Sequence, residues 1–95
     1  MTIPSLHKVP SEQAPMALLL EADPSAAIIA SYLQDGHCVV ARLDEAIVGV
    51  YVIKALSAET WELMNIAVAP ERQGQGIGAL LLRHAIDQAR QLGAQ

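Results

Sequence analysis

Three glycines alternate within five residues between a β-like segment and a helical one, and this arrangement limits the possible folds more than any other feature. The β-like segment, 60–69, stops at Pro70, and a polar turn then leads to Gly74, Gly76 and Gly78. Glycine has no Cβ, so the backbone here can take unusual dihedral angles and approach a ligand closely. The loop opens into a helix N-terminus, where free N–H groups and the helix dipole attract anions. The segment therefore predicts a phosphate or pyrophosphate site, with a ligand-free glycine turn as the alternative.

The helix expected after this loop covers 77–92. Its apolar side chains share one face and its charged side chains the other, which is typical of a helix that packs on a core. The apolar face holds Ile77, Leu81, Ala85, Ala89 and Leu92. The spacing also favours ion pairs of Asp87 with Arg83 and with Arg90, while His84 is expected to lie in solvent.

The rest of the chain predicts one short strand, two helices and a β-hairpin. The expected elements are a strand over 3–9, a helix from 11 to 22, a second from 25 to 35, and strands over 38–43, 46–55 and 60–69. Asp23-Pro24 separates the helices, with Asp23 or Ser25 as the cap of the second. Asp44-Glu45 is expected to form the tight turn of an antiparallel hairpin.

Composition narrows the class of protein. The 95 residues suffice for one domain, and 53% are hydrophobic, which excludes a disordered chain. The net charge of −4 disfavours nucleic-acid binding, and no apolar run is long enough to span a membrane. Cys38 is the only cysteine, so it forms no internal disulfide and is expected to pack in the core; neither it nor the histidines have the spacing of metal ligands. We therefore expect a cytoplasmic protein without a metal.

Two common phosphate-binding motifs fit the glycine loop poorly. A P-loop requires Gly-Lys-Ser/Thr, which is absent. The run from Gly74 to Ala79 formally matches the dinucleotide pattern G-x-G-x-x-A, but four residues separate the strand from the first glycine. The expected acidic residue about 20 positions later would fall at or beyond the last residue, and no second parallel strand follows. A nicotinamide-nucleotide domain is therefore kept only as an alternative.

At these residues the sequence resembles the GNAT superfamily of N-acetyltransferases. Gln73-Gly-Gln-Gly-Ile-Gly78 matches that family's coenzyme A signature Q/R-x-x-G-x-G/A, and Asn65 to Glu71 looks like the end of its fourth strand. The close match covers 62–94, while 38–55 matches in pattern and 1–37 in outline. The resemblance implies an α/β (α+β) GNAT-like fold, a mixed, mostly antiparallel sheet flanked by helices. It also implies a single partial domain over 1–95, without the family's later strands and helix.

The resemblance implies roles for individual residues. Backbone groups of Ile66, Ala67 and Val68 would pair with the pantetheine arm of coenzyme A as though it were an added strand. A bulge in this strand would aim the N–H of Val68 at the thioester oxygen. Glu62 occupies the position of a glutamate base in histone-acetylating members, where partial burial would aid proton transfer, and Asn65 would contact the acceptor. The amides of Gly74 to Ala79 would wrap the pyrophosphate. The remaining cofactor-binding residues are Gln73, Gly74, Gln75, Gly76, Ile77, Gly78 and Ala79.

The resemblance thus implies an acetyl-CoA-dependent N-acetyltransferase that acts by direct attack of a primary amine, on a small molecule or a protein, in a ternary complex. The alternative is a non-catalytic acyl-CoA-binding or interaction module, or a truncated fragment without activity of its own. A tyrosine that reprotonates the thiolate in the family has no counterpart here, since neither Tyr32 nor Tyr51 lies at its position. The strand 60–69 would be an apolar edge, so a homodimer that completes the sheet is a possible assembly.

Overall fold

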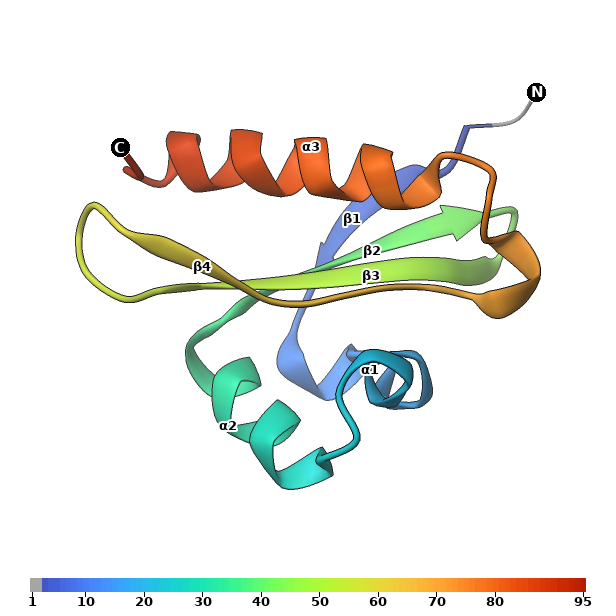
Figure 1. Cartoon of the computed structure of the whole chain (residues 1–95), viewed down its shortest axis with the longest axis horizontal. Helices are drawn as coiled ribbons and strands as arrows, with labels where there is room; N and C mark the ends of the chain where they lie inside the picture. Colours follow the sequence, from blue (N-terminus) through green and yellow to red (C-terminus); the bar gives the residue numbers. More distant parts are fainter. Residues whose placement is uncertain (1–2) are drawn as a thin grey trace.

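The computed structural model describes residues 3–95, which form a four-stranded antiparallel sheet with helices on both faces (Figure 1). The strands lie in the order β1-β2-β3-β4. The elements are β1 (Ser5–Val9), η1 (Ser11–Gln13), α1 (Met16–Ala22), α2 (Ala26–Asp35), β2 (His37–Leu43), β3 (Ala46–Ala55), β4 (Trp61–Val68), η2 (Pro70–Arg72) and α3 (Ile77–Gln91). Every expected strand and helix is therefore present, and the GNAT-like fold class is confirmed below by its structural relatives.

The sheet separates two layers of core. Helix α3 lies along one face, and α1 and α2 cover the other (Figure 1). Side chains of β2 and β3 alternate between the layers, since Val40, Val50 and Val52 pack towards α1 and α2 while Val39 and Tyr51 pack towards α3. The coenzyme loop predicted from the sequence therefore begins at the end of an outer strand and ends at a helix fixed to the core.

Local sequence explains where the helices begin. Ser11 starts a separate short 3-10 helix, and α1 begins only after Pro15, which makes no side-chain cap. Helix α2 is capped by Ser25, whose Oγ accepts a hydrogen bond from the Ile28 N–H at 3.2 Å. Between residues 3 and 95 no single helix has the length and apolarity needed to cross a membrane, although α1 and α2, bent by 111°, pass that test as a pair.

Two expectations for α3 are wrong. His84 is not simply solvated, because its Nδ1 lies 2.7 Å from the Tyr51 hydroxyl. Burial raises the pKa of Tyr51 and so keeps this hydroxyl neutral. Asp87 pairs with neither Arg83 nor Arg90. The single ion pair in the described chain joins Lys54 and Asp35 at 3.9 Å. The rest of the buried face agrees with the pattern, with Leu92 as an exposed exception.

Candidate functional site

The glycine loop holds its backbone in left-handed conformations. Gly74 has φ +82° and Gly76 has φ +85°, and a Cβ built on either would meet no atom within 4 Å. The space in front of these residues is therefore open to a ligand that side chains would obstruct. Gly76 is also the N-cap of α3 and offers no side chain to the helix end.

The first turn of α3 presents unbonded amides beside the loop. The Leu80 N–H donates to the Gly76 carbonyl at 3.1 Å, which is the bond that begins the helix. The N–H groups of Ile77, Gly78 and Ala79 precede that bond and have no intrahelical partner. Together with the helix dipole, these donors form a site suited to an anion. The glycines before them leave open space next to these donors.

The adjoining strand, β4, ends the sheet and has backbone groups that point outward. The Ala69 N–H donates to the Val48 carbonyl at 2.8 Å, which fixes the alternation of the ladder. Ala67 then faces β3, whereas Ile66 and Val68 direct their N–H and C=O groups to the open edge. Gln73 reaches back from the loop, and its Nε2 donates to the Val68 carbonyl at 3.2 Å. The loop and the strand edge are thus tied together by a residue of the signature.

A hollow of about 330 Å³ lies where the edge of β4 meets the start of α3. It is lined by Glu21, Ala22, Ile66, Ala67, Val68, Gln73 and Gly78. Val68 Cγ2 is 3.7 Å from the point where a Cβ on Gly78 would lie, so strand and helix are in close contact here. Five of the predicted cofactor-binding residues therefore lie together here: Ile66, Ala67, Val68, Gln73 and Gly78. The other five line a separate groove: Gly74, Gln75, Gly76, Ile77 and Ala79. Glu21 and Ala22 were not predicted, because nothing in the sequence indicates that the last turn of α1 reaches this edge.

Strand β4 carries the bulge that the resemblance implied, but not beside Val68. Val52 opposes Asn65 while Ile53 opposes Leu63, so Met64 is the extra residue. The irregularity lies between Glu62 and Ile66. It therefore changes the relative orientation of the candidate base and the outward amides of the strand.

Glu62 is exposed on β4, opposite Lys54 in the ladder. The partial burial expected for it is absent, since its side chain lies at the solvent-facing end of the strand. Lys54 is the residue that pairs with Asp35 at 3.9 Å. The carboxylate of Glu62 is therefore accessible to a ligand that approaches the open edge.

Asn65 is a structural residue and not an exposed acceptor contact. Its side chain is 5% exposed, and its Nδ2 donates to the Leu19 carbonyl at 3.1 Å and to the Tyr32 hydroxyl at 2.9 Å. The Tyr32 hydroxyl in turn lies 3.4 Å from Asp23 Oδ2, and burial raises the tyrosine pKa. This network fixes the α1–α2 turn next to β4. The sequence pattern does not indicate that Asn65 would bond to Leu19, which lies 46 residues earlier in the chain.

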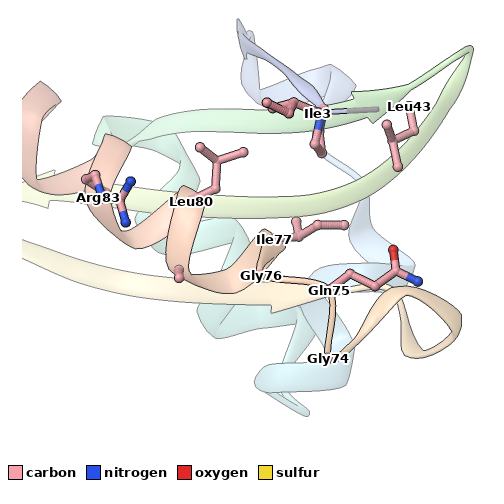
Figure 2. Close-up of a pocket in the computed structure, with 10 residues that line it drawn as sticks. Ile3, Leu43, Gly74, Gln75, Gly76, Ile77, Leu80 and Arg83 are labelled. Carbon is pink, nitrogen blue, oxygen red and sulfur yellow. The ribbon is translucent and has the colours of Figure 1, made fainter. Parts of the chain in front are cut away.

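A second groove, of about 640 Å³, lies on the other side of the loop (Figure 2). Its walls are apolar except for the loop backbone, Gln75 and Arg83, and sequence reasoning did not find it. Its lining residues are Ile3, Pro4, Leu43, Gly74, Gln75, Gly76, Ile77, Ala79, Leu80 and Arg83.

Cys38 and the metal-ligating residue types form no further site. Cys38 is buried in the core, where desolvation raises the pKa of its thiol to about 11. Within residues 3–95 no group of three or more His, Cys, Asp or Glu side chains is arranged to hold a metal ion.

An antiparallel sheet with an open last strand, followed by a glycine loop and a helix N-terminus, defines an α/β protein whose loop is suited to a phosphate-bearing ligand. The chain belongs to the acetyltransferase (GNAT) family, whose family model matches residues 4–95. The family assignment confirms the resemblance and displaces the nicotinamide-nucleotide alternative, which requires a parallel sheet.

Its relatives share the fold over nearly the whole chain. A Bacillus subtilis protein named as an uncharacterized N-acetyltransferase is 43% identical over 77 residues, which are 81% of this chain and 50% of that protein. An IAA acetyltransferase from Bacillus cereus has a TM-score of 0.89 and 46% identity, covering 92% of this chain and 58% of the other. A GNAT family acetyltransferase from Elizabethkingia anophelis, solved with acetyl-CoA bound, has a TM-score of 0.91 and 38% identity, covering 97% and 61%. The chain thus spans about half the length of the curated relative it matches.

Proposed function

We propose that this protein binds acetyl-CoA and takes part in transfer of the acetyl group to a primary amine by direct attack in a ternary complex. The observation that carries the proposal is the junction of the β4 edge with the N-terminus of α3. There Ile66 and Val68, with their outward amides, line one hollow together with Gly78 of the first turn of α3. This continuity matches a ligand that has a pyrophosphate at one end and an extended amide-bearing arm at the other. The relative solved with acetyl-CoA supports the choice of coenzyme.

The loop residues would hold the pyrophosphate. Gly74 and Gly76 leave open space in front of the backbone, and the amides from Gly74 to Ala79 would act as donors around it. The Gln73 N–H is already bonded to the Pro70 carbonyl at 3.4 Å. Because these donors are backbone groups on a helix fixed to the core, they are already positioned before the ligand arrives. Gln73 also orients the loop through its bond to the Val68 carbonyl.

The open edge of β4 would bind the pantetheine arm. Ile66 and Val68 direct their backbone groups outward, so an extended amide chain can add to the sheet as another strand would. Ala67 directs its backbone towards β3 and contributes its small side chain to the floor of the hollow.

An outward amide of β4 would donate to the thioester oxygen as negative charge develops on it. Val68 was expected in this role, and Ile66 is the second amide that faces the edge. The thioester lies at the far end of the arm from the pyrophosphate. Ile66 is farther from the loop and, at about 3.3 Å per residue, roughly 7 Å closer to Glu62 along the strand. We therefore assign the donation to Ile66, with Val68 binding the arm.

Glu62 would act as the general base. Its exposed carboxylate can accept a proton from the acceptor ammonium, directly or through a water molecule. When bound, acetyl-CoA would supply an activated acyl carbon: the amine nitrogen bonds to that carbon, the C–S bond breaks, and the sulfur leaves as a thiolate. The nitrogen, which has already given one proton to Glu62, loses a second on forming the amide, and this proton balances the one that the thiolate takes up. The carboxylates of Glu21 and Glu62 favour a cationic amine at this edge.

The second candidate is a module that binds acyl-CoA without turnover. The exposure of Glu62 favours it, because a solvent-facing glutamate is also an ordinary surface residue of a strand. The two candidates share the coenzyme site and differ only in the role of this residue.

Replacement of Glu62 by Gln separates them. For an acetyltransferase we expect the acetylation rate to fall about 10²-fold or more, while the affinity for acetyl-CoA stays within twofold of wild type. The matched control is Glu59→Gln, which replaces an exposed carboxylate in the β3–β4 turn by the same carboxamide. This variant should change neither the rate nor the affinity. Calorimetry measures affinity, and thiol release with a panel of primary amines measures turnover. Unchanged turnover in Glu62→Gln would contradict the assigned base, and binding without turnover by the wild type would support the module.

A further inference from the structure

The buried amide of Asn65 has one atom that no other group satisfies. Its Nδ2 donates to the Leu19 carbonyl and to the Tyr32 hydroxyl, whereas its Oδ1 is buried and has no hydrogen-bond partner among residues 3–95. Turning the amide over would place Oδ1 against the Leu19 carbonyl, which can only accept, so the orientation is fixed. A buried acceptor without a donor lowers stability, and an apolar side chain of similar size would avoid this loss. Stability alone therefore does not account for an amide at this position.

The hydrogen bonds of Asn65 reach the turn between α1 and α2. The Leu19 carbonyl, in the last turn of α1, also accepts from the Asp23 N–H at 3.1 Å. The Tyr32 hydroxyl accepts from Asn65 and donates its own hydrogen to Asp23 Oδ2 at 3.4 Å. Asp23 Oδ1 in turn accepts from the Ser25 N–H at 3.1 Å. One side chain of β4 is thus joined to both helices that cover this face of the sheet.

Asn65 directly follows the extra residue of the β4 bulge. Met64 packs against the core layer of α1 and α2, and Asn65 bonds to residues of the same layer, so two successive side chains share one face. Ile66 then packs in the layer of α3, and its N–H faces the open edge. The normal alternation of a strand is therefore interrupted immediately before the amide assigned to the thioester oxygen.

We propose that Asn65 is a positioning residue for acetyl transfer: its two hydrogen bonds hold β4 after the bulge in the orientation that directs the Ile66 N–H to the thioester oxygen. The inference rests on the proposed function, because it takes this N–H as the donor. The peptide unit that links the two residues is planar, so its N–H turns with the backbone of Asn65. A donor stabilises a developing oxyanion only when it is already aimed at that oxygen. Asn65 does not line the hollow, so it acts through the strand and not by contact with the coenzyme.

Asn65→Leu removes both hydrogen bonds with little change in side-chain size. Neither partner is left unsatisfied, because the Leu19 carbonyl keeps the Asp23 N–H and the Tyr32 hydroxyl keeps Asp23 Oδ2. We expect a Tm close to that of wild type, a Kd for acetyl-CoA within about twofold, and a kcat lower by about tenfold or more. Val40→Ala, in the same core layer, is the control for a purely structural loss: it should lower Tm and leave kcat unchanged.

Tyr32→Phe removes one of the two anchors and provides a second variant. It should lower kcat by a few-fold at an unchanged Kd for acetyl-CoA. In the Asn65→Leu background it should lower kcat no further, because the hydroxyl acts on the strand only through Asn65. An unchanged kcat in either single variant, or an equal Tyr32→Phe loss in both backgrounds, would overturn the inference while the proposed function stands. Absence of thiol release by the wild-type chain with every amine of the panel would overturn the proposed function and this inference together.

Discussion

Gly76 combines two requirements that no other residue type meets equally well. Its φ of +85° lies in the left-handed region, and the space where a Cβ would point is empty of protein atoms. Gly78, two residues later, has an ordinary helical environment, where a Cβ would rest 3.7 Å from Val68 Cγ2. The two positions of the signature therefore differ physically: Gly76 is restricted by its backbone conformation, whereas Gly78 has room for a methyl group in ordinary contact with Val68.

Gly76→Val should abolish coenzyme binding and leave the fold largely intact. A branched side chain at this φ costs about 1–3 kcal/mol of folding free energy and projects into the space of the pyrophosphate. Gly78→Ala is the matched control: it should keep binding within a few-fold, because a methyl fits there and the signature accepts alanine. Circular dichroism melts measure the fold, and calorimetric titration with acetyl-CoA measures binding. Unchanged affinity in Gly76→Val would show that the loop does not hold the pyrophosphate.

Residues differ in how much of their role the sequence indicates. The glycines were predictable because left-handed turns and close ligand approach restrict the residue type locally. Asn65 and His84 were not, because their roles depend on the hydroxyls of Tyr32 and Tyr51, each 33 residues away in sequence. Sequence patterns report faces and turns, whereas a buried hydrogen bond depends on which elements meet.

At the scale of elements, the position of α3 on the sheet sets the geometry of the site. The helix packs over β3 at Gly49, where an added Cβ would come within 2.8 Å of Leu81 Cδ1 and 3.2 Å of Ile77 Cγ2. Leu81 is fully buried, so its side chain would have to shift within a packed core to admit the methyl group. Since Ile77 is the first residue of α3, the contact at Gly49 also fixes the height above β4 of the amides proposed to bind the pyrophosphate.

Gly49→Ala should therefore affect stability and binding together. Overpacking at this contact is expected to lower the free energy of unfolding by about 1–3 kcal/mol. Displacement of α3 should weaken the binding of acetyl-CoA several-fold. Val40→Ala is the control, since it creates a cavity on the opposite face and should cost about 2 kcal/mol without moving α3. Urea denaturation and titration of both variants give the two quantities. An affinity loss of equal size in Val40→Ala would mean that global stability, and not helix position, controls binding.

The elements themselves could be predicted because each has a local signature. The spacing of apolar residues predicted α3 and the β2–β3 hairpin. Asp23-Pro24 and Ser25 predicted where α1 ends and α2 begins. The 3-10 helix at Ser11 differed because Pro15 delays the α-helix. The bulge at Met64 and the second groove could not be placed, since both arise from how strand register and separate segments combine.

For the whole molecule, the dominant feature is that β4 ends the sheet in residues 3–95 with its outward amides unpaired by a neighbouring strand. An apolar surface flanks this edge. Leu82 and Ile86 lie four and eight residues after Gly78, on the helix face that contacts Val68, and are 44% and 45% exposed. Such an edge favours pairing with further polypeptide or with the coenzyme arm, and both would use the same backbone groups.

A thermal shift at two protein concentrations tests how this edge is used. With acetyl-CoA at about 100 times its Kd, binding adds ~2.7 kcal/mol of stability, which for a domain of this size raises Tm by about 10 °C or more.

If a second copy completes the sheet, Tm without ligand should rise with protein concentration, because dissociation accompanies unfolding. Pairing through the same amides that bind the arm makes the two effects competitive, so the ligand-induced shift should shrink as protein concentration increases. A Tm independent of concentration, with a full shift on acetyl-CoA, would exclude the homodimer and leave the edge to the coenzyme. No shift at either concentration would mean that these 95 residues do not form the coenzyme site by themselves.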